Sequence, residues 1–530
     1  MSFKPIYVYS LFSMILLIWM GNPLSAQRSA GQQDQISDLS AANGPFPGDL
    51  SLYQHELEIS KNTTSPGYYP SLNAAEISGA QRSGFFPGAS FTGSFEGPNQ
   101  VFAWRSADKY QGLTYICNRE PGELYLVGGD YPPPTGLMPA GPYLAKADAT
   151  TGKEIWRTYV DNANVSGRWI GNGNLNIMED GNIRFSWSNQ IVLIDGDSGR
   201  ILKHNTLPSG KAPAGDVNYK HLTIAPDRTL LLKCQTRPTG EKSQGTMAIF
   251  KGLAKGLKQP NSHLVAVHPD TLDVLDETPL PEPASAPHIV TMHDGKIATY
   301  IPVDSGILRY FWNPEKQQLS KDDGWLMTAQ QEGQSASTAA TLIGDWVAVQ
   351  TNGAGSFDSA SSIVVAHRND ANKKHTIFPF GDLNQGEWSF APPKAGVDPE
   401  NNMIYSADAG VGKVAGIEVD PESGELSVAF VVDDRTTTFQ PTIGPKDKRV
   451  LLLTNIKMND PQQPMMQAMF SANYKEQLTW REASSGRILA ESDFFEPLTI
   501  NSLTTPGFGG RVYFPTINDY IMFQVLPVSR

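Results

Sequence analysis

The sequence predicts an all-β protein, an eight-bladed β-propeller, with seven blades as the alternative. Two hairpin patterns alternate along the chain, and the 48 Gly and 39 Pro among 530 residues are spread out, as many short turns require. Long helical periodicity is nearly absent. Two hairpins per period of about 50 residues supply one four-stranded sheet, and stacking such sheets around an axis buries their apolar faces.

The first hairpin pattern is an acidic or glycine-containing turn followed by a β-rich run. It occurs eight times, with turns that start near residues 121, 180, 226, 294, 344, 399, 446 and 509. Each copy predicts the first two strands, A and B, of one blade.

The second pattern is clearest in residues 144–156, LAKADATTGKEIW, where a turn at 148–152 joins two strands. Gly152 adopts the positive φ of such a turn without steric cost. Weaker copies lie at 191–203, 264–276, 308–320, 363–377, 414–430 and 478–492. These copies predict strands C and D of each blade. The eighth copy, 520–527, is a single strand because the chain ends, so we expect residues 100–105 to add the missing strand and close the ring.

Residues 147–156, ADATTGKEIW, resemble the repeat of the pyrroloquinoline-quinone-type β-propellers. The resemblance is also strong at 191–203 and moderate at 420–425 and 483–487, and as a repeat it covers about residues 105–530. It implies eight blades, with a tryptophan of each blade docked under the next, although only the first copy keeps this residue, as Trp156. Related propellers include dehydrogenases, assembly scaffolds and binding proteins, so the resemblance specifies architecture better than activity.

The N-terminal region predicts an exported protein. Lys4, an apolar stretch at 6–20 and small residues before Gln27 form the layout of a signal peptide over 1–26, cleaved after Ala26. An uncleaved anchor is the alternative, but the apolar run is short for a span of about 20 residues. The mature protein is then secreted, or periplasmic in a Gram-negative source, without a transmembrane span. Residues 27–100 are interpreted as an extended, partly disordered lead-in to a propeller at 101–530.

Charge and cysteine content exclude some partners and links. The net charge is −12 and no basic stripe is visible, which excludes nucleic acid as an expected partner. A secreted protein could pair Cys117 with Cys234, but they would lie in blades one and three, and a disulfide requires Cα atoms within about 7 Å. Two buried free thiols are expected. Asn62 and Asn164 begin glycosylation sequons that matter only in a eukaryotic source.

Polar residues at the start of the innermost strands are candidates for a ligand site at the mouth of the central channel. Six residues before successive turns stand Asn174, His221, His288, Thr338, Lys394 and Gln440, with Asn501 near the same place in blade eight. The alternative is that these side chains bond one another and channel water. His221 and His288 occupy adjacent blades, but two histidines without a third ligand do not predict a metal, so no metal site is predicted.

The long insertions are all B–C loops or links between blades, which share one face of a propeller. They are 128–141, 237–262, 456–477, 205–218 and 324–335. Insertions gathered on one face indicate a binding face. The second contains AIFKGLAKGLK, which suits a helix. The third contains Met458, Met465, Met466 and Met469, which suit either an adaptable contact patch or the packing of a lid. Residues 195–199, DGDSG, lack the spacing of a calcium loop and are interpreted as a turn.

Three functions are compatible with these observations. The first, which we favour, is a monomeric, non-catalytic binding or scaffold protein that holds a protein, a polymer or a small molecule on the insertion face. The second is a quinoprotein oxidoreductase with pyrroloquinoline quinone and calcium. The resemblance implies an adjacent cysteine pair for such dehydrogenases, and Cys117 and Cys234 are not adjacent. The third is a hydrolase or lyase with His221 or His288 as general base. No GxSxG, HExxH or phosphate-binding loop is present, so no catalytic residue is assigned and no cofactor is predicted.

Overall fold

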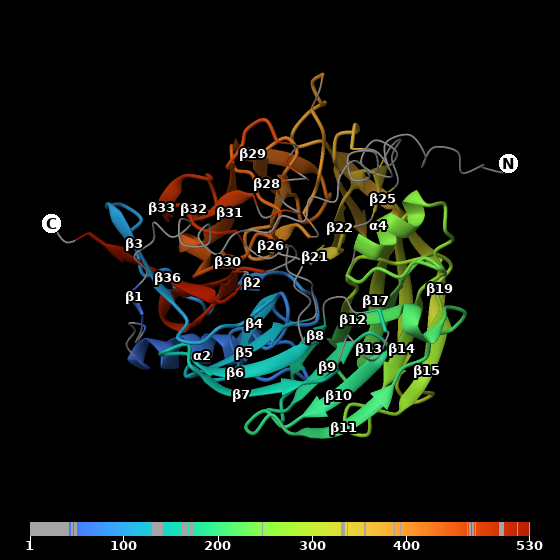
Figure 1. Cartoon of the computed structure of the whole chain (residues 1–530). Helices are drawn as coiled ribbons and strands as arrows, with labels where there is room; N and C mark the ends of the chain where they lie inside the picture. Colours follow the sequence, from blue (N-terminus) through green and yellow to red (C-terminus); the bar gives the residue numbers. More distant parts are fainter. Residues whose placement is uncertain are drawn as a thin grey trace.

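A computed structural model shows eight β-sheets arranged radially around a central axis, which confirms the eight-bladed propeller (Figure 1). The structure describes residues 42–43, 46, 50–129, 141–161, 168–169, 173–245, 247–329, 334–336, 338–353, 357–385, 387–392, 394–463, 465, 468, 471, 473–497, 503–516 and 518–528. The predicted signal peptide and Asn501 lie outside these residues. None of the described helices has the length and hydropathy to cross a bilayer.

The blades follow the chain in order, each with strand A nearest the axis. Blade one contains β4 (Tyr115–Asn118), β5 (Glu123–Gly128), β6 (Tyr143–Asp148) and β7 (Glu154–Tyr159). Blade two contains β8 (Asn174–Ile177), β9 (Ile183–Trp187), β10 (Gln190–Ile194) and β11 (Ile201–Thr206). Blade three contains β12 (Val217–Ile224), β13 (Leu230–Thr236), β14 (His263–Val267) and β15 (Val274–Pro279). Blade four contains β16 (Ile289–His293), β17 (Lys296–Val303), β18 (Gly306–Asn313) and β19 (Gln318–Thr328).

The second half of the ring repeats this plan. Blade five contains β21 (Thr341–Ile343), β22 (Trp346–Gln350), β24 (Ile363–His367) and β25 (Asp370–Ile377). Blade six contains β26 (Gly396–Asp398), β27 (Met403–Asp408), β28 (Lys413–Val419) and β29 (Leu426–Val432). Blade seven contains β30 (Thr442–Ile443), β31 (Val450–Met458), β32 (Tyr474–Glu482) and β33 (Ile488–Glu491). Blade eight contains β34 (Thr505–Pro506), β35 (Arg511–Pro515), β36 (Tyr520–Pro527) and β3 (Asn99–Arg105).

Shorter elements complete the fold. They are β1 (Ala42–Asn43), β2 (Phe85–Phe86), the pair β20 (Gln334–Ser335) and β23 (Asn352–Gly353), the α-helices α2 (Leu50–Thr63) and α4 (Met247–Ala254), and the 3-10 helices at Ala214–Asp216, Lys446–Lys448 and Phe508–Gly510. Helix α4 confirms the helix expected in the insertion at 237–262.

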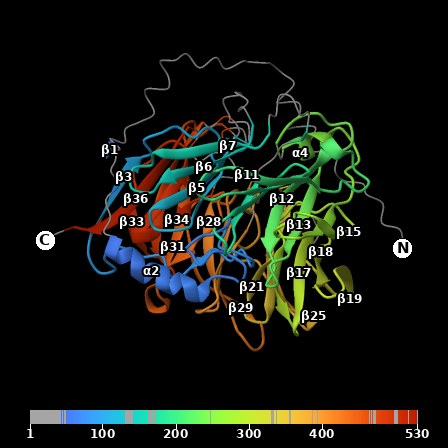
Figure 2. The same cartoon turned by 90° about the horizontal axis from the view of Figure 1, so that it is seen from below.

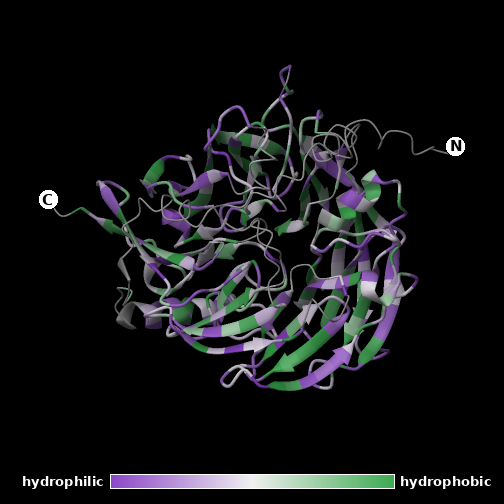
Figure 3. Cartoon of the chain, in the orientation of Figure 1, coloured by the Kyte–Doolittle hydropathy of each residue, from purple (hydrophilic) through white to green (hydrophobic). Residues whose placement is uncertain are grey.

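The apolar core lies between neighbouring blades. Middle strands such as β10 and β13 are buried along their whole length, whereas the outermost strand β11 is mostly exposed. A strand that is covered on both faces carries a near-continuous apolar run instead of an alternating one. Figure 3 shows these hydrophobic runs as green stretches along the blades. Radial stacking therefore buries the apolar faces that an isolated four-stranded sheet would expose to water.

The C–D turns of blades one and two share one geometry, which confirms the turn predicted at 195–199. Asp148 Oδ1 accepts hydrogen bonds from the N–H groups of Thr150 and Thr151, both at 2.8 Å, and Asp195 bonds residues two and three positions on in the same way. A glycine with positive φ then closes the turn, as in Gly199 at 72°. A Cβ on Gly199 would stand 2.6 Å from the Trp156 ring. The Trp156 ring of blade one therefore docks against the turn of blade two.

The ring closes through the predicted strand. β3 pairs antiparallel with β36 over its whole length, from Asn99 opposite Pro527 to Arg105 opposite Ile521. The N-terminal strand thus supplies strand D of the last blade, next to a strand C from the C-terminus. Hydrogen bonding between the two ends of the chain leaves no gap in the ring.

The lead-in differs from the extended segment expected from its composition. Its described part begins with β1 and then forms helix α2, whose Tyr53 ring packs on Phe508 with centroids 6.0 Å apart. In Figure 2 this helix and α4 lie at opposite ends of the propeller axis. Glu56 of α2 accepts a 2.7 Å hydrogen bond from the N–H of Gly509 in the A–B turn of blade eight. Gly, Ser and Pro in this segment allow irregular backbone to follow the propeller surface.

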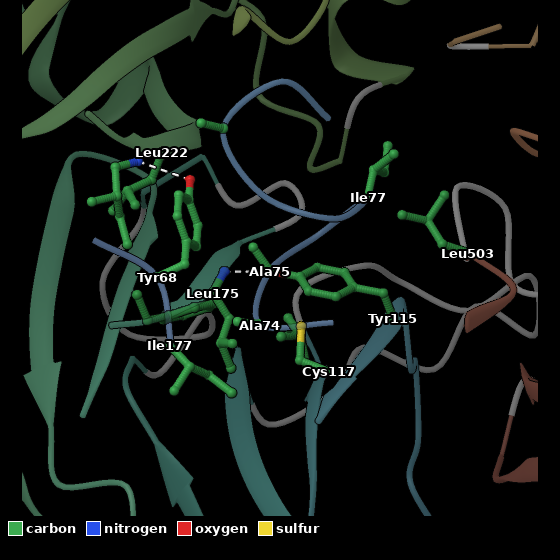
Figure 4. Close-up of a cluster of buried hydrophobic side chains, with 14 of the residues drawn as sticks. Tyr68, Ala74, Ala75, Ile77, Tyr115, Cys117, Leu175, Ile177, Leu222 and Leu503 are labelled. Carbon is green, nitrogen blue, oxygen red and sulfur yellow. Dashed lines mark hydrogen bonds between the residues drawn. The ribbon is translucent and has the colours of Figure 1, made fainter. Parts of the chain in front are cut away.

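After α2 the chain enters the central channel from the A–B turn side. Tyr68 and Ala75 form isolated bridges with Met178 and Asn176 beside strand β8, and the phenolic oxygen of Tyr68 accepts a hydrogen bond from the N–H of Ile224 (Figure 4). Further on, β2 pairs parallel with β30 in blade seven. Figure 4 shows Tyr68, Ala74 and Ala75 among buried side chains of the innermost strands. Residues 68–86 therefore fill the channel and bond to several blades.

The channel segment, residues 68–86, contains an ion pair between Glu76 and Arg82. The Arg82 guanidinium contacts the carboxylate of Glu76, and their side chains are 2% and 17% exposed. Arg82 also donates to the Leu222 carbonyl of blade three at 3.1 Å, and Asn174 of blade two donates to Glu76 at 2.7 Å. The pair therefore ties the segment to two blades at the axis.

Docking of α2 should weaken as pH rises through the range in which Glu56 ionises. Burial raises the pKa of Glu56 from 4.5 to about 7. The folded state thus holds the proton more tightly than the unfolded chain, so this stabilisation is complete below pH 4.5 and is lost as pH rises toward 7. We expect the unfolding free energy, measured by urea titration, to fall by up to about 3 kcal/mol over this window relative to Glu56→Gln. Equal pH profiles for the two proteins would contradict this.

Removing the acidic partner in the channel should destabilise the protein. In Glu76→Ala the Arg82 guanidinium stays buried without its counter-charge, which costs about 3–5 kcal/mol. Urea unfolding measures this loss. Glu58→Ala is the matched control, because Glu58 pairs with Lys61 on the surface at 2.7 Å, with side chains 66% and 45% exposed, and such pairs contribute about 0–1 kcal/mol. Equal effects of the two substitutions would show that the buried pair does not hold the segment.

Candidate functional site

Five of the six described residues of the predicted channel-mouth site lie at or just before the start of an innermost strand, His221 lies in the middle of β12, and all six are buried. Their exposed fractions are 0% or 1%, for Asn174, His221, His288, Thr338, Lys394 and Gln440. The lead-in bonds to two of them, because Asn174 donates to Glu76 and Lys394 donates to the Gln81 carbonyl at 3.5 Å. The sequence predicted that these residues lie around the axis, but it did not predict that residues 68–86 cover them.

The two histidines are held neutral by their surroundings. Burial, with smaller contributions from nearby cations that include Arg82 and Lys233, lowers the pKa of His221 and of His288 well below 6.5. Neither ring nitrogen of His221 has a hydrogen-bond partner among the described residues. Water or a small polar ligand would satisfy such a group. A ligand site and a set of side chains bonded to channel water therefore both stay predictions for these residues.

The other members of the ring are bonded mainly to the protein itself. Lys394 Nζ donates to the Ala340 carbonyl at 2.8 Å, and burial lowers its pKa well below 10.5. Gln440 Nε2 donates to the Thr438 carbonyl at 2.6 Å, and the Thr338 hydroxyl donates to the Gln350 carbonyl. These bonds fix the inner ends of blades five to seven. Such contacts are structural ones, which the sequence alone does not distinguish from ligand contacts.

The chemistry open to this ring is limited by access. A general base must lie within hydrogen-bond reach of the substrate. Both imidazoles are 0% exposed, so a substrate would reach them only after displacement of the lead-in or of neighbouring strands. Across the described parts of the chain, no three His, Cys, Asp or Glu side chains are grouped so that they could hold a metal ion.

The two cysteines are free and buried, as the blade spacing predicted. Burial raises the pKa of Cys234 from 9.0 to about 11 and that of Cys117 well above its usual value. The thiolate is the reactive form of cysteine, so both thiols are chemically quiet in the folded protein.

The insertions pack against one another on the face opposite α2. Trp169, in the link before blade two, is buried against Ala248 and Ile249 of α4, and its indole N–H donates to the Gly245 carbonyl at 3.0 Å. Arg237, at the start of the same insertion, pairs with Asp216 at 2.5 Å. These contacts join the link before blade two to the insertion at 237–262, and that insertion to the one at 205–218.

A cluster of three aromatic rings lies on this face between blades five and six. We call Phe357, Trp388 and Phe390 the aromatic cluster. The Phe357 centroid stands 6.1 Å from that of each of the other two rings, and Trp388 and Phe390 are 6.3 Å apart. All three side chains are partly exposed. Partly exposed aromatic rings are a common feature of interaction surfaces.

Asp408, at the end of β27, holds the loops that carry the aromatic cluster. One carboxylate oxygen accepts from the hydroxyls of Ser361 and Ser389 at 3.2 and 2.5 Å, and the other accepts from the N–H groups of Phe390, Gly410 and Val411 at 2.9–3.1 Å. Asp408 is only 1% exposed. A buried carboxylate with every acceptor position used fixes these loops rigidly.

The methionine-containing insertion at 456–477 packs against the aromatic cluster. Met465 is buried and Met458 is partly buried, and both belong to an apolar group with Tyr474 that Trp388 and Phe390 pack against. This placement agrees with lid packing, while Met466 and Met469 lie outside the described residues. The aromatic cluster was not identified from the sequence. The available signal was a set of aromatic residues in loops rich in Gly, Ser and Pro, away from any strand pattern.

The comparisons with known proteins show the fold of this chain and do not show its family. No protein-family model matches the chain, and no curated protein matches it in sequence. Among solved structures, the quinohemoprotein alcohol dehydrogenase from Comamonas testosteroni has a TM-score of 0.52 at 8% identity, over 91% of this chain and 84% of that one. A quinohemoprotein alcohol dehydrogenase from Pseudomonas putida HK5 has a TM-score of 0.53 at 9% identity, over 92% and 85%. The chain therefore has a propeller fold similar to that of quinoprotein dehydrogenases.

Proposed function

We propose that the protein is a non-catalytic binding or scaffold protein that holds a partner protein on its insertion face, outside the cytoplasm. The observation that supports this most directly is the aromatic cluster, which is partly exposed, ordered by Asp408 and packed on the insertion at 456–477. Binding energy at interfaces concentrates in a few aromatic and arginine side chains held in fixed positions. The signal-like sequence at residues 1–26 supports the location.

The filled channel supports a site away from the axis. In many ring-shaped proteins the channel is the natural pocket, but here Glu76, Arg82 and the strand residues around them occupy it. A ligand at the predicted channel mouth would meet Lys394 and Gln440, which are buried and already bonded to the protein. A partner can reach the exposed loops without displacing the lead-in, and preformed surfaces bind with a smaller entropic cost.

Truncation of Trp388 in the aromatic cluster should abolish partner binding. Panning a phage-displayed random peptide library against the full chain selects peptides that serve as probes of its binding surface. We expect Trp388→Ala to lose the enriched binders, with a cost of at least about 2 kcal/mol, because this change removes an anchor held by both neighbouring rings. Trp104→Ala is the matched control: it removes a partly buried tryptophan that stacks on Phe102 at 5.9 Å in the outer strand of blade eight. Binders retained by Trp388→Ala would argue against the aromatic cluster.

The alternative function, a quinoprotein oxidoreductase, is tested by adding pyrroloquinoline quinone and calcium. A ligand that binds the native state raises the melting temperature by mass action. We expect no shift in melting temperature and no dye reduction with alcohols or sugars, because a cofactor on the axis would compete with Glu76 and Arg82 for space. A saturable rise in melting temperature, or substrate-dependent dye reduction, would favour the enzyme.

A further inference from the structure

Strand β29, the outermost strand of blade six, differs from the other outer strands in having no charged residue. Its sequence is LSVAFVV. Every other outer strand contains at least one charge, such as Arg105, Arg157, Lys203, Asp276, Lys321, Lys373 and Glu491. Proteins commonly place charges on edge strands to prevent them from pairing with other chains. β29 therefore lacks the charged residue that disfavours pairing of the other outer strands with another chain.

The edge of β29 is open to a partner. In its sheet β29 pairs only with β28, so its other edge offers unpaired backbone groups among the described strands. Val428 and Val431 are 40% and 42% exposed. A bulge interrupts the pairing with β28 after Gly416, but the same C–D bulge occurs in other blades, for example after Leu193 in blade two. The absence of charge, not the bulge, distinguishes this strand.

Phe430 and Val432 keep this edge in place from the other side. A Cβ on Gly486, in the turn of blade seven, would stand 2.7 Å from the Phe430 ring and 2.8 Å from Val432. These two side chains are thus packed against the next blade, whereas Val428 and Val431 are turned to solvent. The strand is anchored and its apolar outer side chains are accessible, which is the arrangement that strand addition uses.

The start of β29 is acidic. Glu418, Glu422 and Glu425 are exposed there, and none of them forms a salt bridge among the described residues. The cation beside them, Lys373, donates to the Glu422 carbonyl at 2.9 Å. At the other end, the exposed Asp433 has Lys413 and Arg435 nearby, because β28 begins at Lys413 and Val414 pairs with Val432. The start of the strand is therefore net acidic and its end is not.

We propose that β29 docks an extended, apolar peptide segment of another protein that carries lysine or arginine at one end. Backbone hydrogen bonds to the open edge would supply affinity, Val428 and Val431 would contact alternate side chains, and the glutamates at the start of the strand would select the basic end. This site lies on the side of blade six and goes beyond the function proposed for the insertion face.

The test uses the full chain and a labelled peptide of alternating valine and threonine with two lysines at one end. Fluorescence anisotropy should show binding that weakens at high salt. Val428→Lys and Val431→Lys, tested separately, should each weaken binding at least about tenfold. Ile155→Lys is the matched control, because Ile155 is 56% exposed on the outer strand β7, and it should leave the affinity unchanged. Melting curves confirm that each variant is folded.

Further measurements separate the possible occupants. The same peptide with glutamates in place of lysines should bind at least about tenfold more weakly, and hydrogen exchange of residues 426–432 should slow when the lysine peptide is added. Trp388→Ala should bind the peptide normally, so failure of this site and failure of the insertion face are distinguishable. The proposal is overturned by absence of binding, by equal binding of the glutamate peptide, by equal loss in Ile155→Lys, or by self-association of the protein that Val428→Lys abolishes.

Discussion

The pairing of β3 with β36 is the constraint on which the rest of the structure depends. A four-stranded blade cannot bury its apolar faces alone, so each blade relies on the next one around the ring. The ring is complete only when Asn99–Arg105, from the N-terminal side, takes its place beside the last strand of the chain. This single antiparallel pairing joins residues more than 400 positions apart and lets all eight blade interfaces form together.

Closure also explains the position of the lead-in. Because β3 must reach the outside of blade eight, the residues before it start on the A–B turn side, where α2 packs on Phe508 and Gly509. From there the chain passes through the axis and returns through β2. The channel that a bare ring would leave open is thereby filled with polar and charged groups that bond to several blades. The insertion face lies at the other end of the axis, so the path of the lead-in does not constrain its loops.

Polar networks fix both regions, but they leave different surfaces. At the axis, Glu76 and Arg82 bond to each other and to the inner strands, and the result is a centre with little exposed surface. On the insertion face, Asp408 satisfies the loops while the aromatic cluster stays partly exposed. Similar hydrogen-bonding chemistry thus stabilises the propeller in one place and shapes a candidate binding surface in the other.

The sequence by itself determined the all-β class, the eight blades, the closing strand near residues 100–105, the turn at 195–199 and the two separate buried cysteines. These features depend on short-range patterns of turn residues and apolar runs, which repeat along the chain. It also placed Asn174, His221, His288 and Lys394 at the inner ends of their blades. Only the tertiary structure decided that residues 68–86 cover this ring, that α2 replaces an extended segment, and that Phe357, Trp388 and Phe390 meet between two blades. Those contacts join residues that share no repeat and lie far apart in the chain, so packing and hydrogen bonding in three dimensions, not local periodicity, select them.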